Sequence, residues 1–179
     1  MDTYTGILAA YLAAMVGMVV VGVVVYVVTA FFMSKVFAKA GVQGTWRAWV
    51  PVYNFMVFFK LGDLSPWLVL YCFAGAVVLS WVGIGFIFSL ALFVGGGVAA
   101  YRVGLKTGKE PALVALWLIP AAWFGVIGLS KSTWNTAVAP AQWAGNGFLA
   151  DRTEWQGVPA QASAVDAPAQ PERPAEAGA

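Results

Sequence analysis

The sequence contains no histidine and only one cysteine, and charged residues make up 10% of its 179 positions. Without histidine, the chain lacks the usual general base at neutral pH and the commonest metal ligand. One cysteine, Cys72, cannot form an internal disulfide or a zinc or iron–sulfur cage, and its apolar neighbours suit a small buried hydrophobe. We therefore expect no metal and no cofactor.

Charge is too scarce for a protein that is surrounded by water. A soluble domain usually carries about 25% charged residues, whereas this chain is 61% hydrophobic with a mean hydropathy of +0.79. Its net charge of +2 is spread over scattered lysines and arginines, too few for a nucleic-acid surface but typical of groups that flank a membrane. The composition excludes a water-soluble enzyme and predicts an all-α integral membrane protein.

Uncharged stretches predict four transmembrane helices, with three as the alternative. The predicted spans are residues 6–33, 66–82, 86–102 and 111–130. The first lacks the basic flank and short core of a secretory signal peptide, so we expect it to remain as an anchor. The two counts differ at Leu64–Tyr101, which forms either one long tilted pass or two short passes that meet at Gly83 and Gly85.

Residues 46–60 predict a short interfacial or re-entrant helix, because an apolar stretch of about 18 Å is too short to span. Pro51 disfavours helix at the preceding residue and frees a backbone carbonyl one turn back. The Asn54 amide is placed to satisfy such a carbonyl. Pro120 predicts a kink in the last span.

Two stripes of small residues predict helix faces on which another helix can pack closely. The first stripe is Ala9, Ala13 and Gly17, and the second is Ala91, Gly95 and Ala99.

Residues 1–134 are predicted to form the helical membrane domain and residues 135–179 a polar, largely disordered tail. The last part of this tail is rich in Ala, Pro, Gln and Glu, which cannot bury a core. Trp134, Trp143 and Trp155 suit the level of the lipid headgroups. Since lysine and arginine favour the cytoplasm, the basic loops at 34–65 and 102–109 place the N-terminus outside, and four passes place the tail outside as well.

One polar constellation is a candidate site: Arg47, Tyr53, Asn54, Lys60 and Asp63. On a kinked helix these residues could bind an anionic headgroup or solute. The structural alternative, which we favour, is that Arg47 and Lys60 anchor the helix, Tyr53 and Asn54 repair the proline break, and Lys60 pairs with Asp63. The uncharged spans contain no Asp or Glu, which ion-coupled transporters normally need at membrane depth.

Several short motifs resemble an uncharacterised family of small bacterial membrane proteins. The resemblance covers roughly residues 31–134 and rests on Lys39-Ala40-Gly41, Gly44, Trp46, Pro51-Val52-Tyr53-Asn54, Pro66-Trp67 and the basic loop with Gly104 and Gly108. That family is a domain of unknown function, and similar modules occur fused ahead of bacterial signal peptidase domains. The resemblance implies a multi-pass protein of the bacterial plasma membrane and no activity.

We therefore expect a non-catalytic membrane module that lies in the lipid bilayer and binds an envelope protein, a lipid or a second copy of itself. The alternative is a small oligomeric channel or transporter component. No enzymatic constellation is apparent in the sequence.

Overall fold

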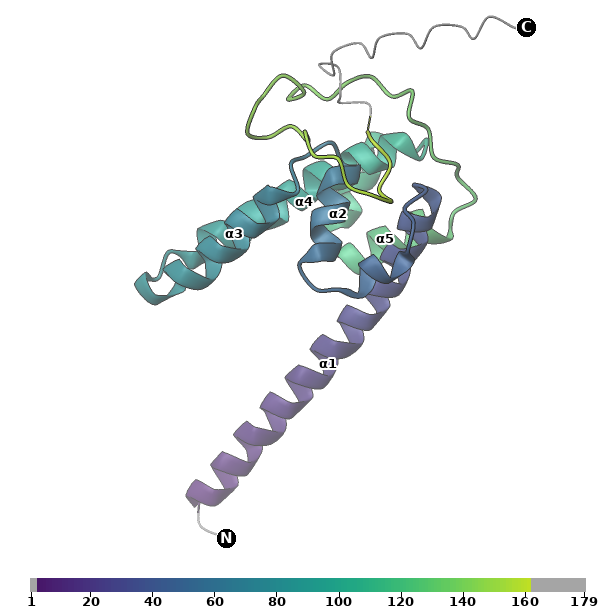
Figure 1. Cartoon of the computed structure of the whole chain (residues 1–179). Coiled ribbons are helices and arrows are strands. Elements are labelled where there is room, and N and C mark those ends of the chain that lie inside the picture. The colour runs from purple at the N-terminus through teal and green to yellow at the C-terminus, as the bar shows by residue number, and fades with distance from the viewer. Residues whose placement is uncertain (1–2, 162–179) are drawn as a thin grey trace, which may run out of the picture.

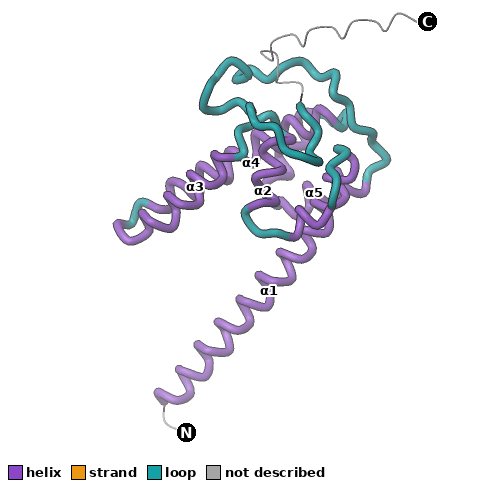
Figure 2. The backbone as a smooth tube through the Cα atoms, in the orientation of Figure 1, coloured by secondary structure: helices purple, strands orange, loops and turns teal. Residues whose placement is uncertain are grey.

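The computed structural model describes residues 3–161, which form helices joined by loops, with isolated bridges but no β-strand in that range. The all-helical prediction is confirmed. Two helices, α1 and α4, are long and apolar enough to cross a membrane. Figures 1 and 2 show the arrangement. The elements are α1 (Thr3–Lys39), η1 (Thr45–Trp49), α2 (Tyr53–Leu61), α3 (Trp67–Val78), η2 (Leu79–Val82), α4 (Gly85–Lys106), η3 (Pro111–Leu118) and α5 (Pro120–Leu129).

Helices α3 and α4 pack together as a hairpin, so Leu64–Tyr101 is not one long helix. The chain reverses at Gly83, whose φ of +78° is accessible to glycine at little cost. Gly85 then starts α4 in close contact with the end of α3. A Cβ on Gly85 would lie 2.4 Å from the carbonyl oxygen of Ala76. These two glycines make the tight turn that the sequence offered as one alternative.

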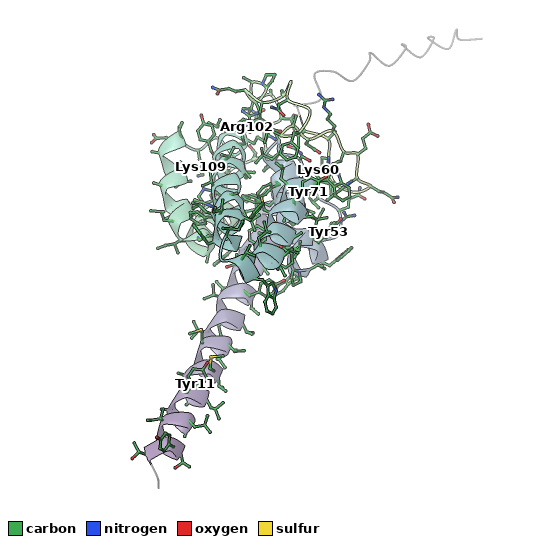
Figure 3. The ribbon with its side chains drawn as sticks, turned by 90° about the vertical axis from the view of Figure 1, so that its left-hand side faces the viewer. Tyr11, Tyr53, Lys60, Tyr71, Arg102 and Lys109 are labelled. Atoms are coloured by element: carbon green, nitrogen blue, oxygen red, sulfur yellow. The ribbon has the colours of Figure 1, made fainter. Side chains whose placement is uncertain are left out.

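Lysines and arginines gather at one end of the helices, which we call the polar end. It is formed by the C-terminal ends of α1, α2 and α4, at Lys39, Lys60 and Lys106. Figure 3 shows Lys60, Arg102 and Lys109 at this end, while Tyr11 lies far along α1. No lysine or arginine of the described range occurs in the stretches 3–34, 61–101 or 110–130 that run away from it.

After α1, the chain turns back from the polar end and then returns to it. The Tyr26 hydroxyl donates a 2.7 Å hydrogen bond to the carbonyl of Trp49, about 20 Å along α1 from Lys39. The break between η1 and α2 contains Pro51 and Val52, whose φ is +66°. Helix α2 then rises to the polar end and is almost wholly buried. Residues 46–60 are therefore two short helices, η1 and α2, that meet at this break.

The predicted fourth span, residues 111–130, is a second descending and returning segment and not a single helix. Trp117 Nε1 donates a 2.9 Å hydrogen bond to the carbonyl of Phe93, far down α4. Helix α5 then returns, and Lys39 Nζ donates to the carbonyl of Ser130. The break falls at Ile119–Pro120, because proline has no N–H to continue a helix. The following residues thus begin at the polar end, which corrects the expectation that they emerge opposite the basic loops.

An aromatic cluster joins the two returning segments. Phe58 of α2 lies 4.8 Å from Phe124 and 5.6 Å from Trp117, measured between ring centroids. Trp123 lies 5.2 Å from Phe124 and has no exposed surface. These edge-to-face and stacked contacts bury large apolar area in the middle of the fold. The cluster therefore holds α2, η3 and α5 together.

The two small-residue stripes differ in what they contact. Gly95 and Ala99 of α4 pack against α2 and its C-terminal cap, where a Cβ on Gly62 would lie 2.5 Å from Ala99 Cα. Ala91 of the same stripe is exposed. In the first stripe, Ala9, Ala13 and Gly17 are all exposed. Close packing is thus seen for part of the second stripe, and the first has no neighbour within the described chain.

Residues 131–161, which we call the cap segment, lie across the polar end without regular secondary structure (Figure 2). Ala141, Ala150 and Val158 are buried there. This differs from the expectation of a largely disordered tail from residue 135, because three tryptophans and several polar contacts attach the segment to the helices. Residues 162–179, the rest of that predicted tail, lie outside the described residues.

The hairpin turn gives a stability test. We expect Gly85→Ala to destabilise the protein by about 1–3 kcal/mol, because the added Cβ meets backbone atoms that cannot move aside. Thermal unfolding in detergent measures this. Gly104→Ala in the same helix is the control, since a Cβ there meets nothing within 4 Å and alanine favours helix. Equal melting temperatures for the two variants would contradict the turn geometry.

Candidate functional site

The five candidate residues fall into two groups that lie at opposite ends of α2. Arg47, Tyr53 and Asn54 form the first group, in which Arg47 Nη1 donates a 2.5 Å hydrogen bond to the Tyr53 hydroxyl, and Lys60 and Asp63 form the second. The guanidinium also lies 5.6 Å from the ring of Trp46, and Tyr53 stacks on Trp155 at 5.5 Å. Arg47 Nη2 donates to the carbonyl of Gln156 at 2.8 Å. This group therefore binds part of the cap segment.

Asn54 repairs the proline break, as the structural alternative predicted. Its side-chain amide donates a 3.2 Å hydrogen bond to the carbonyl of Ala48 in η1. Its amide oxygen accepts from the backbone N–H of Phe55 at 2.7 Å. A buried backbone carbonyl without a partner would cost about 1–3 kcal/mol. With both polar atoms of its amide engaged, Asn54 acts as a structural residue.

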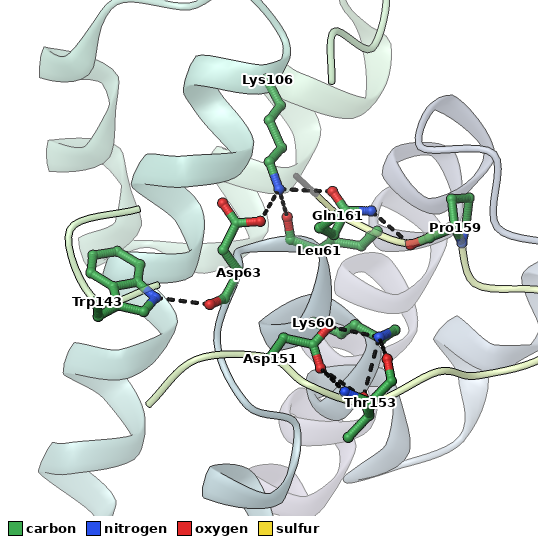
Figure 4. Close-up of polar contacts among 9 residues, drawn as sticks. All are labelled: Lys60, Leu61, Asp63, Lys106, Trp143, Asp151, Thr153, Pro159 and Gln161. Carbon is green, nitrogen blue, oxygen red and sulfur yellow. Dashed lines mark hydrogen bonds and ion pairs between the residues drawn. The ribbon is translucent and has the colours of Figure 1, made fainter. Parts of the chain in front are cut away.

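Asp63 is the centre of the second group and has no exposed surface. Its carboxylate accepts from Lys106 Nζ at 2.5 Å and from Arg102 Nε at 2.7 Å (Figure 4 shows the Lys106 bond). The Lys106 ammonium also donates to the carbonyl of Leu61 at 2.8 Å and to the side chain of Gln161 at 2.7 Å. One carboxylate thus holds the chain just after α2 to the end of α4.

Lys60 pairs with the cap segment and not with Asp63, which corrects the expected Lys60–Asp63 pair. Its ammonium lies 2.6 Å from an Asp151 carboxylate oxygen and donates to the carbonyl of Thr153 (Figure 4). Asp151 in turn accepts from the Thr153 hydroxyl at 2.7 Å. Lys60 is only 1% exposed, so it does not anchor the helix in the headgroup layer. Its charge is balanced inside the protein.

Two further contacts attach the cap segment to the same region. Trp143 Nε1 donates a 2.8 Å hydrogen bond to the carbonyl of Asp63, and the indole of Trp134 lies beside the Lys106 ammonium, 5.9 Å away.

Sequence reasoning missed the roles of Arg102, Lys106, Asp151 and Gln161. The useful signal was the presence of tryptophans in a segment otherwise poor in large apolar residues, since aromatic rings usually mark an ordered contact.

The site as a whole is a set of closed internal contacts. Three buried cations face two acids, Asp63 and Asp151, and every one of these groups has a protein partner. In residues 3–161 no cluster of three or more acids or cysteines could hold a metal ion. The arrangement can bind the cap segment and fix helix ends.

The Asp63 contact predicts a large loss of stability for Asp63→Asn. The substitution leaves Arg102 and Lys106 buried beside a neutral amide, and breaking a buried pair in this way costs about 3–5 kcal/mol. Unfolding in a denaturing detergent measures the change. Glu110→Gln is the matched control, because Glu110 is exposed and makes no ion pair. Equal stability of the two variants would mean that the triad does not hold the polar end together.

The Lys60–Asp151 contact predicts that Asp151→Asn loosens the cap segment. Trypsin should then cleave after the exposed Arg152 about tenfold faster, since losing roughly 1.4 kcal/mol of local stability raises the open population tenfold. Limited proteolysis followed by mass spectrometry reads this. Glu154→Gln, an exposed acid in the same segment, should leave the rate unchanged. Equal acceleration in both variants would show that general charge, and not the Lys60 contact, is responsible.

No family model matches the chain, and neither a curated protein nor a solved structure does.

Proposed function

We propose that this chain is a non-catalytic integral membrane module that binds another membrane-embedded protein of the cell envelope through α1. The observation that carries the proposal is the exposure of α1. Residues 6–25, the first small-residue stripe among them, are all exposed. In this region α1 projects from the rest of the fold (Figure 1). In lipid, a face of small residues is where a second helix approaches most closely.

The length of α1 supports a partner as well as lipid. The uncharged stretch from Thr3 to Ser34 is about 48 Å long at 1.5 Å per residue, and the hydrocarbon core is about 30 Å thick. With Lys35 and Lys39 at the headgroups, a tilt of about 50° would be needed to bury it. Membrane helices tilt by about 0–40°. A neighbouring protein would cover the excess apolar surface.

The distribution of charge supports one orientation in the bacterial plasma membrane. Except for Arg47 of η1, the lysines and arginines of residues 3–161 belong to the polar end or to the loops that cover it. By the positive-inside rule this end faces the cytoplasm and the N-terminus lies outside. Helix α1 and the two arms of the α3–α4 hairpin then make three crossings. The two returning segments enter the bilayer from the cytoplasmic side.

The polar contacts favour a binding module over the alternative of a channel or transporter component. A permeation or coupling site needs polar groups that can exchange partners with a solute. Here Asn54, Lys60 and Asp63 are engaged by the protein's own backbone and side chains. Their geometry supports a role in holding the fold.

Site-specific photocrosslinking in intact cells tests the proposal. A small diazirine side chain at Ala13 should give one defined adduct with another membrane protein. The same group at Met15, about 200° around the helix, is the matched control and should give little. Gly17→Ile should reduce the Ala13 adduct about tenfold, as the loss of about 1.4 kcal/mol of packing would do. Equal labelling from both positions would contradict a specific face, and an adduct with a second copy would replace the partner by a homo-oligomer.

A further inference from the structure

Four lysines gather on the α1–α5 side of the polar end and form what we call the basic patch: Lys35, Lys39, Lys109 and Lys131. Lys39 donates to the carbonyl of Ser130 and, at 3.2 Å, to its hydroxyl. Lys131 follows Ser130 directly in the chain. Lys109 lies close enough to Lys39 for the two charges to interact. Lys35 is one turn before Lys39, and a Cβ on Gly128 of α5 would lie 3.2 Å from its Cβ.

The basic patch has a surplus of positive charge that residues 3–161 do not balance. The acids of this range are Asp63, Glu110, Asp151 and Glu154. Asp63 and Asp151 pair with other cations, and no ion pair within the described range involves a patch lysine. Glu110 lies beside Lys109 in sequence, which leaves a local net charge of about +3 from these residues. Like charges this close repel, so a bound anion would stabilise the patch.

Hydroxyl groups accompany these lysines. The side-chain oxygens of Ser130 and Ser132 lie 2.6 Å apart, on either side of Lys131. An ammonium group and a hydroxyl can both donate to the oxygens of a phosphate group. The Ser130 hydroxyl donates to the carbonyl of Ile127 at 2.8 Å, so the lysine ammonium groups supply the charge and the hydrogen-bond donors that the patch offers to an anion.

Apolar surface begins immediately next to the basic patch. The Lys35 ammonium lies 5.2 Å from the ring centroid of Phe31, which is itself exposed. On α5, Val126 and Leu129 are exposed beside it. Helices α1 and α5 pack against each other, so exposed apolar side chains of both helices lie near the lysines. A free inorganic anion would use only the lysines, whereas a lipid would use both surfaces.

We propose that the basic patch binds the anionic headgroup of a membrane phospholipid whose acyl chains lie along the exposed faces of α1 and α5. The lysines hold the phosphate, and the exposed apolar side chains next to them hold the acyl chains. Basic pockets between membrane helices on the cytoplasmic side recognise anionic headgroups in this way. The inference rests on the proposed membrane location, and it names the class of lipid that the protein binds there.

The test uses the full-length protein in vesicles. Flotation first shows whether the chain is incorporated. The protein is then extracted from vesicles of equal phosphatidylglycerol and phosphatidylcholine, and the lipid that stays bound is counted by mass spectrometry. We expect the wild type to retain phosphatidylglycerol preferentially. Lys35→Gln/Lys131→Gln should lower that preference about tenfold or more, since each lysine near the surface contributes about 1 kcal/mol. Lys131→Gln alone should lower it about fivefold, whereas Arg152→Gln, which removes one exposed charge outside the basic patch, should leave it unchanged.

The other outcomes are decisive in different ways. Equal retention of both lipids by the wild type, or equal losses in Lys131→Gln and Arg152→Gln, would overturn the basic patch as a lipid site. Displacement of the bound phosphatidylglycerol by about 10 mM inorganic phosphate would show that a soluble anion is the ligand and would overturn the role of the apolar side chains. Failure to float with vesicles would overturn the proposed membrane module itself, and the lipid site with it.

Discussion

Asp63 is a carboxylate without exposed surface, and most of the polar end depends on it. Its two oxygens hold Arg102 and Lys106 of α4, and its carbonyl holds Trp143 of the cap segment. A buried carboxylate is costly unless its charge is paired and its lone pairs are filled. The chain meets that requirement by bringing the end of α2, the end of α4 and the cap segment to one point. Lys60 likewise pairs with Asp151 of the cap segment, so this second buried acid also has its charge balanced.

The two returning segments, which leave the polar end and come back to it, reflect a second constraint. Backbone N–H and C=O groups away from water need hydrogen-bond partners within the protein. Pro51 and Pro120 each interrupt a helix, and each break lies far from the polar end. Asn54 satisfies one freed carbonyl, and the Trp117 indole adds a bond to the backbone of α4. Non-helical backbone at membrane depth is tolerated only where other protein surrounds it. The aromatic cluster around Phe58 supplies those surroundings.

The sequence was most informative where a single residue type controls the backbone. Gly83 and Gly85 predicted the place of the hairpin turn, and Pro51 with Asn54 predicted a break and its repair. Hydropathy could not show that residues 111–130 fold back, because a crossing helix and a returning pair have the same composition. Nor could it show which acid meets which base. Lys60 and Asp63 are three residues apart, yet each finds its partner across the fold, and such choices depend on tertiary packing that local spacing does not contain.

The returning segments α2 and α5 extend only part of the way from the polar end, while α1 and the α3–α4 hairpin continue and diverge (Figure 1). In the membrane placement proposed above, the protein would displace more lipid from the leaflet at the polar end than from the other leaflet. It would then act as a cone whose base lies at the polar end. A cone of this kind fits a membrane that bulges toward its base, so the shape of the fold couples the position of the protein to local curvature.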